Sequence, residues 1–404
     1  MTPSDLYKHN RSAFIRYLIS RNIARFSNTA YYIYFMWEIV ANYHSVFLVS
    51  LIPGFSLLGY LIVAIPEGAI IDKYSRHVIY IVLNLFMVVT YSLLIHGDSL
   101  LIIYAVDFLS SMFAWVISDD FRALEKEIIP AEHMANAQSA DQLSSGLSTL
   151  LGIVAGGVLI FMNYRDVYIL LIGISILALA IIFVPNTIMA SHRSVVKNGF
   201  RSTFKIVKSI LPFLLLTTIL NGMFVALDVF SSGLIYIVMH ASSIYYTFFI
   251  AGFPTGMLVG GLLSMHPFFR KYQKSKKLIA VYVLLTGVII ILMAFNRIPI
   301  MDGFLSFGAG LILAFINIYI ETMVINSIPS SITGKFNSIT TMFSVSSSPL
   351  MAFVFGYLSL FFYFPFILAA IGIMTLFISL TVSRIMNGFT SSMERIEGEN
   401  PELF

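Results

Sequence analysis

Five ionisable side chains lie inside long apolar stretches of this 404-residue chain: the acids Asp107, Asp228 and Glu321 and the bases Arg21 and Arg25. A charge at the middle of a bilayer costs about 2.5–3.5 kcal/mol, so it needs a partner, a cavity or a function. Burial favours the protonated form of a carboxyl, and a neighbouring Arg favours the ionised form. A carboxyl that gains and loses such a neighbour would take up and release a proton. The three acids are therefore candidates for proton coupling, with static helix pairing or direct substrate contact as alternatives.

Uncharged polar residues share helical faces with these charges. Arg21, Arg25, Asn28 and Tyr32 follow the spacing i, i+4, i+7, i+11, which places them on one face of the first helix. In the same way, Asn221 shares a helical face with Asp228, and Asn317 shares one with Glu321. From their depths, at ~1.5 Å per residue, we expect Arg25 to pair with Asp107 and Arg21 with Glu321. The residues expected to line a cavity and contact substrate are Arg21, Arg25, Asn28, Tyr32, Asn221 and Asn317.

The composition is that of a membrane protein. Hydrophobic residues make up 58% of the chain and charged residues only 11%, against about one quarter in soluble domains. So little charge excludes an ordinary soluble enzyme and a nucleic-acid binder. The chain has no Cys, which excludes disulfides and thiolate chemistry.

Twelve stretches are long and apolar enough to span a bilayer, which takes about 20 residues each. The predicted fold is therefore all-α, with twelve transmembrane helices in two six-helix bundles around a central cavity. The expected spans are 13–40, 45–66, 77–96, 99–119, 138–162, 166–190, 210–239, 242–266, 278–296, 299–327, 336–361 and 363–385.

Lys and Arg residues in the loops predict the orientation, since they accumulate on the cytoplasmic side. The side that holds both termini carries 19 of them and the opposite side only Arg165 and Arg297. We therefore expect a multi-pass protein of the cell membrane with both termini in the cytoplasm.

The chain repeats itself at an offset near 200. Gly54-Phe55 recurs as Gly252-Phe253, Lys73-Tyr74 as Lys271-Tyr272, and Ile129-Pro130 as Ile328-Pro329. Duplicated six-helix halves are typical of alternating-access transporters, whose substrate site lies between the repeats. The expected organisation is an N-terminal bundle at 1–190, a basic cytoplasmic linker at 191–209, a C-terminal bundle at 210–385 and a disordered cytoplasmic tail at 386–404. The interior charges fall on the first, fourth, seventh and tenth spans, as they would if these helices lined one cavity.

The segment from Gly68 to His77 resembles the signature of the major facilitator superfamily, Gly-x-x-x-Asp-Arg/Lys-x-x-Arg-Arg/Lys, with His77 in the last basic position. The resemblance implies a conformational latch. Asp72 would lie near the start of the eleventh helix, at about 334–337, and Arg76 would pair with Asp119 or Asp120. Gly68 would allow close helix approach.

Two further segments resemble an antiporter branch of this superfamily. The stretch with Gly152, Gly156 and Gly157 is similar to the Gly-Pro-x-x-Gly-Gly of its antiporters, with Ile153 in place of Pro, and it predicts close helix packing. Arg21, Ser27-Asn28 and Trp37 stand at the spacing of conserved positions in macrolide-efflux-like drug:proton antiporters, although Arg21 and Asn28 replace the Gln and Asp of that branch.

The sequence lacks a phosphate-binding Gly-x-x-x-x-Gly-Lys-Ser/Thr and a His-Glu-x-x-His, so we expect no nucleotide, cofactor or metal site and no enzyme. The prediction is a monomeric secondary active transporter that exports an amphipathic small molecule in exchange for protons. Two alternatives remain open. One is an uptake or facilitative carrier for a metabolite, metal ion or lysolipid, and the other is a non-transporting receptor or scaffold.

Overall fold

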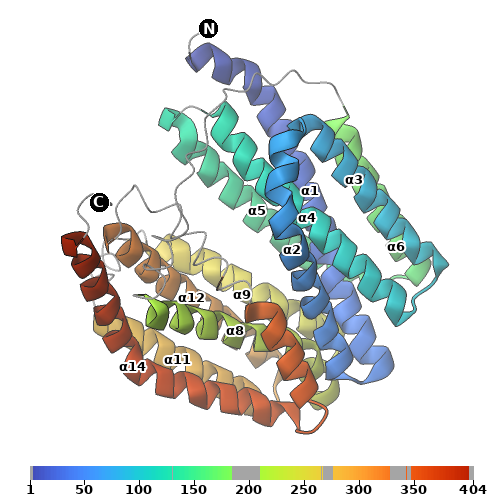
Figure 1. Cartoon of the computed structure of the whole chain (residues 1–404). Coiled ribbons are helices and arrows are strands. Elements are labelled where there is room, and N and C mark those ends of the chain that lie inside the picture. The colour runs from blue at the N-terminus through green and yellow to red at the C-terminus, as the bar shows by residue number, and fades with distance from the viewer. Residues whose placement is uncertain are drawn as a thin grey trace. The chain divides into compact units, whose positions relative to one another are not determined.

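The computed structural model describes residues 3–129, 131–183, 210–264, 266, 276–327, 343 and 347–399, and these are all-helical apart from short turns. Ten helices are long and apolar enough to cross a membrane. Two further helical segments bring the total in the described chain to twelve. They are α1 (Pro3–Tyr43), which carries Arg16, Arg21 and Arg25, and the shorter Ser347–Leu358; Figure 1 shows the arrangement of the helices. The prediction of an all-α membrane protein is thus confirmed.

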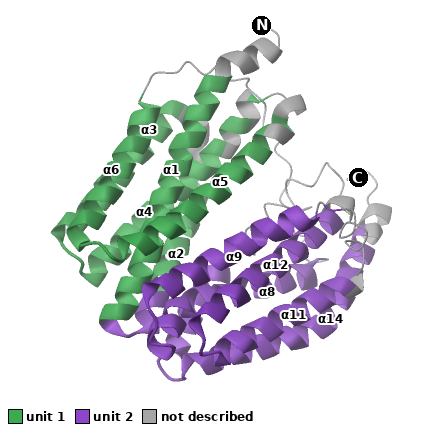
Figure 2. Ribbon diagram, turned by 180° about the vertical axis from the view of Figure 1, so that it is seen from behind, with its two compact units in different colours: residues 1–42, 51–195 green, residues 43–50, 196–404 purple. Residues whose placement is uncertain are grey.

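The chain divides into two compact units (Figure 2). The first contains residues 1–42 and 51–195, and the second contains residues 43–50 and 196–404. The division near residue 195 falls within the predicted linker at 191–209, which lies outside the described residues. The turn after α1 and the first residues of α2 belong to the second unit, which the sequence analysis did not predict.

The first unit is built from α1, α2 and four further helices, one of which ends in a short 3-10 turn. The bounds are α2 (Val46–Lys73), α3 (Arg76–Ser92) with η1 (Leu93–His96), α4 (Leu100–Ile128), α5 (Ala131–Leu159) and α6 (Tyr164–Ile182). Tyr74 and Ser75 alone separate α2 from α3, so a tight turn joins the two helices.

The second unit contains the remaining helices, around a core of large apolar side chains. The bounds are α8 (Leu211–Gly233), continued by the π-helical η2 (Leu234–Val238), α9 (Ser243–Ser264), α11 (Lys276–Phe295), α12 (Pro299–Ser327), the short Ser347–Leu358 and α14 (Phe364–Glu399).

The last helix continues well beyond its apolar stretch. The prediction of a disordered tail after residue 385 was wrong as far as Glu399, because α14 runs on to that residue. Met386, Phe389 and Met393 are at most 2% exposed, and the Phe389 ring lies 4.4 Å from that of Phe213 on α8. The three side chains follow helical spacing and bury one face of the extension in the core of the second unit.

Glycines bring several pairs of helices into backbone contact. On α5, a Cβ added to Gly152 or Gly156 would lie 2.9 or 2.8 Å from carbonyl oxygens of α1, so the predicted close packing of these two residues is present in the structure. Gly157 is buried as well. Gly59 brings α2 against α4 in the same way, with 2.7 Å to the carbonyl oxygen of Phe108.

The corresponding pair in the second unit is α9 with α12. Gly252, Gly256 and Gly260 follow one another at intervals of four residues along α9, and each faces the α12 backbone. A Cβ at these positions would lie 2.0–2.7 Å from carbonyl oxygens of α12, a distance that no side chain can occupy. The small residues therefore define a continuous seam between the two helices.

Candidate functional site

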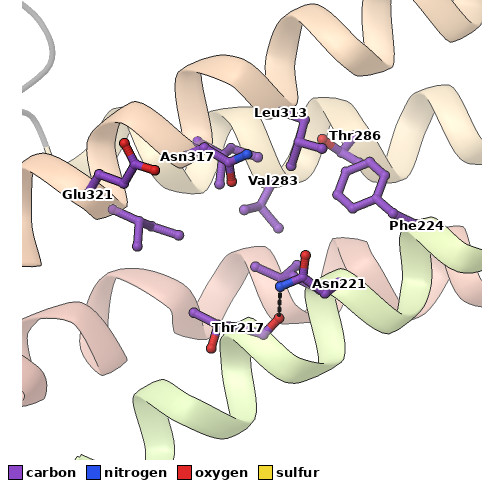
Figure 3. A pocket seen from close by; sticks show the side chains of 11 residues that line it. Thr217, Asn221, Phe224, Val283, Thr286, Leu313, Asn317 and Glu321 are labelled. Atoms are coloured by element: carbon purple, nitrogen blue, oxygen red, sulfur yellow. Dashed lines mark hydrogen bonds between the residues drawn. The ribbon is translucent and has the colours of Figure 1, made fainter. Parts of the chain in front are cut away.

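A pocket of about 270 Å³ lies in the second unit among α8, α11 and α12. Figure 3 shows its two polar walls: Thr217 and Asn221 come from α8, and Asn317 and Glu321 come from α12. Thr286 of α11 adds a hydroxyl, and the remaining lining is apolar, including Leu220, Val283 and Leu313. Three residues that were singled out in the sequence, Asn221 of α8 and Asn317 and Glu321 of α12, therefore line one pocket.

The two amides are placed by the helices that carry them. Asn221 donates from Nδ2 to the carbonyl oxygen of Thr217, one turn earlier on α8, at 2.9 Å (Figure 3). This bond fixes the side chain and leaves its Oδ1 and second amide hydrogen for a ligand. Asn317 and Glu321 are four residues apart on α12, so they share one face of that helix.

The pocket is chemically different at its two ends. Glu321 lies at one end and the Phe224 ring at the other, with the amides between them (Figure 3). Asn221, Asn317 and Glu321 are all exposed although they belong to strongly apolar helices. Within the described part of the chain, the Glu321 carboxylate forms no ion pair. A carboxylate at one end and an aromatic ring at the other suit a molecule with a cationic group and an apolar body.

Asp228, seven residues after Asn221 on α8, is outside this pocket. It is exposed, and the buried Tyr246 of α9 lies near enough to interact with it electrostatically. Asp228 therefore lies about 10 Å along α8 from the pocket amide.

Arg21 is paired differently from the prediction. Its guanidinium forms an ion pair with Asp141 of α5, donates to Ser145 Oγ at 2.6 Å and lies 4.2 Å from the centre of the Phe121 ring. The expected partner, Glu321, belongs to the other unit. The prediction failed because α5 starts at Ala131 rather than at 138, which places Asp141 in the third helical turn instead of the first.

Arg25 does not pair with Asp107. Its guanidinium donates to Ser118 on α4 at 3.3 Å, and Ser118 is eleven residues, or ~16 Å, along that helix from Asp107. Asp107 is 1% exposed and its Oδ2 accepts no hydrogen bond. Similar depth in the membrane did not determine which way the long Arg side chain extends.

The other predicted residues of the first unit have separate environments. Asn28 accepts a hydrogen bond from Ser110 at 3.0 Å, and Tyr32 is half-buried. Of the predicted latch, Asp120 is buried and Asp119 half-buried, but the side chains of Gly68, Asp72 and Arg76 and the segment 334–337 lie outside the described residues. The latch therefore stays a prediction.

Sequence reasoning missed Thr286 in the pocket and Asp141 as the partner of Arg21. Thr286 is one hydroxyl within an apolar run, and its only signal would have been its position on α11 relative to α8 and α12. No group of three His, Asp or Glu in the described ranges could hold a metal ion.

Comparison with known proteins supplies the family. The model of the Major Facilitator Superfamily matches residues 17–352. The chain belongs to this superfamily. The members of this superfamily are transporters, and the ten apolar helices agree with a multi-pass membrane protein.

Solved structures show the same fold at low sequence identity. The nucleoside transporter NupG matches with a TM-score of 0.72 and 10% identity, covering 93% of this chain and 98% of that one. A bacterial homologue of the human lysosomal transporter Spinster, in an inward-facing and unoccupied conformation, gives 0.71 and 13%, covering 95% and 94%. A D-xylose-proton symporter gives 0.69 and 12%, covering 93% and 97%. No curated protein sequence matches this chain significantly.

Proposed function

We propose that this transporter exports a cationic, amphipathic small molecule across the cell membrane in exchange for protons. The observation that carries the proposal is the pocket of the second unit, with Glu321 at one end, Phe224 at the other and two amides between them. A protonated amine would bind the carboxylate, an aromatic body would lie against Phe224, and hydrogen-bonding groups would meet Asn221 and Asn317.

Proton coupling follows from the same carboxylate. An exchanged proton and a cationic substrate can compete for Glu321, because each neutralises its charge. Glu321 lines the pocket, so a proton and a substrate would reach it through the same cavity. Alternating access would expose the pocket to the two sides of the membrane in turn.

Direction and orientation rest on the sequence. The excess of Lys and Arg on the side of both termini supports cytoplasmic termini. The proposal of exchange also draws on the resemblance of the segment with Gly152 and Gly156 to the antiporter motif, in which Ile153 stands in place of Pro. Nothing in the described pocket requires a second subunit, and we propose that the monomer is the transporting form.

The test is transport in proteoliposomes with an imposed pH gradient and a dye that reports internal pH. Aromatic cations such as ethidium are compared with a neutral and an anionic analogue, in the wild type and in Glu321→Gln, Asp228→Asn and Asp107→Asn. We expect cation-dependent proton flux that Glu321→Gln abolishes and that Glu38→Gln, outside the pocket, retains. Substrate movement without proton flux would favour the facilitative carrier, and flux that survives in Glu321→Gln would refute the assigned role of the carboxylate.

A further inference from the structure

A second polar cluster, in the interior of the first unit, is separate from the pocket. Asp107 of α4, Ser27 of α1 and Tyr91 of α3 are each at most 1% exposed. Asp107 Oδ2, Ser27 Oγ and the Tyr91 hydroxyl form no hydrogen bond. Three unsatisfied oxygens on three helices are unusual, because nearly all buried polar groups in proteins have a partner.

These three groups are neighbours. The Tyr91 hydroxyl lies beside the hydroxyls of Ser27 and Ser110 and interacts electrostatically with Asp107. Ser56 of α2 lies close to the Asp107 carboxyl of α4. The close contact at Gly59, one turn after Ser56, brings α2 near enough for this. Ser110 of α4 donates to Asn28, the residue after Ser27 on α1, and the hydroxyls of Ser56 and Ser111 share a hydrogen bond between α2 and α4. Hydroxyl and carboxyl oxygens from four helices therefore lie close together.

The charge of Asp107 is not balanced by any described side chain. Arg25 reaches Ser118 instead, and the described ion pair of this unit joins Arg21 and Asp141. A buried, unpaired carboxylate costs several kcal/mol. A proton on Asp107 would remove the charge but would leave Ser27 and Tyr91 unsatisfied. A bound cation would balance the charge and give all three oxygens a ligand bond.

The donor set indicates the kind of cation. Oxygen-only donors suit hard cations. One carboxylate balances one positive charge, so a divalent ion would leave an uncompensated charge in an apolar interior. The tight approach of α2 to α4 favours a small ion over a large one. We propose that Asp107, Ser27, Tyr91, Ser56 and Ser110 form a binding site for a dehydrated sodium ion.

The site goes beyond the proposed export function and does not depend on it, because all its residues belong to the first unit and none lines the pocket. It assigns Asp107 a role different from proton exchange, for which a fully buried group has no direct contact with water. Sodium binding in the first unit would stabilise one arrangement of α1, α2, α3 and α4.

The test is equilibrium binding to the purified full-length protein in detergent, without substrate. Radioactive ²²Na⁺ binding and the thermal unfolding midpoint are measured at constant ionic strength while Na⁺ replaces K⁺ or choline. We expect one saturable Na⁺ site per chain and a midpoint that rises with Na⁺ and not with K⁺. Asp107→Asn should abolish both responses, and Asp166→Asn, on the exposed first turn of α6, should retain them.

Ser27→Ala and Tyr91→Phe keep the proposal testable if Asp107→Asn fails to fold. The hydroxyls that they remove have no partner, so the midpoint without Na⁺ should stay unchanged while Na⁺ affinity falls at least about tenfold. Ser175→Ala, which removes a hydroxyl bonded to the Leu171 carbonyl oxygen, is the matched control and should leave Na⁺ affinity unchanged. A wild-type protein that shows neither Na⁺-specific stabilisation nor bound ²²Na⁺ would overturn the proposal. In that case a water molecule or a proton would occupy the cluster instead of sodium. Failure of substrate transport would leave this binding result unaffected.

Discussion

Arg21 on α1 and Asp141 on α5 form a largely buried ion pair, with 3% and 17% of their side chains exposed. The pair lies on the same two helices that Gly152 and Gly156 bring into backbone contact. Polar and steric contacts therefore both hold α5 against α1.

Asp141→Asn should destabilise the protein because it removes the carboxylate that is ion-paired with the buried Arg21 guanidinium. Removing one partner of a buried pair costs about 3–5 kcal/mol. The measurement is the thermal unfolding midpoint in detergent, with the exposed Asp98→Asn as control. Equal midpoints for the two variants would show that the pair contributes nothing to stability.

Gly156→Ala should also destabilise the protein, since its new Cβ would lie 2.8 Å from both the Ala30 carbonyl oxygen and the Ile33 Cβ. Overpacking of this kind costs about 1–3 kcal/mol. Gly173→Ala on α6 is the matched control, because nothing lies within 4 Å of the added Cβ. That control should be neutral or stabilising by up to about 1 kcal/mol. A harmless Gly156→Ala would contradict the close packing of α5 on α1.

Phe389→Ala tests the helical extension beyond the expected last span. Phe389 is 2% exposed and contacts Phe213, so its truncation should cost about 3–5 kcal/mol. Phe377, on the same helix but 68% exposed, is the control and should be nearly neutral when changed to Ala. Unfolding midpoints that fall equally in the two variants would show that the extension does not pack as described.

Asn221→Ala and Asn317→Ala should each raise the KM for a transported cation about tenfold, the effect of losing one hydrogen bond worth about 1.4 kcal/mol. The maximal rate should change less, because neither amide carries a proton. Initial rates in proteoliposomes measure both parameters, with Asn163→Ala, in the turn before α6, as control. An unchanged KM in both pocket variants would remove the amides from the substrate site.

Apolar length predicted the fold well because the bilayer imposes it. The positions of ten of the twelve expected spans and the common face of Asn317 and Glu321 follow from hydropathy and helical periodicity. Hydropathy indicates where a helix leaves the lipid and not where the helix itself ends. It therefore could not predict that α5 begins earlier, and α14 ends later, than the apolar stretch. Met386, Phe389 and Met393 show helical spacing, but they stand among polar residues typical of a tail.

Partners across helices were harder to predict than positions along them. Depth placed Arg25 near Asp107, but rotation about the helix axis and the reach of the side chain direct it to Ser118. The pocket needed the arrangement of three helices, so Thr286 on α11 could not be assigned to it from an apolar run.

The glycine seam of α9 and α12 has a mechanical consequence for the pocket. The backbones of α9 and α12 are in direct contact at Gly252, Gly256 and Gly260 and cannot slide past each other without steric overlap. We therefore expect the two helices to move as one rigid unit. Asn317 and Glu321 belong to α12 and so to this unit, whereas Asn221 belongs to α8 and Thr286 to α11. A change in the width of the pocket therefore requires α9 and α12 to move together, as one unit, relative to α8 or α11.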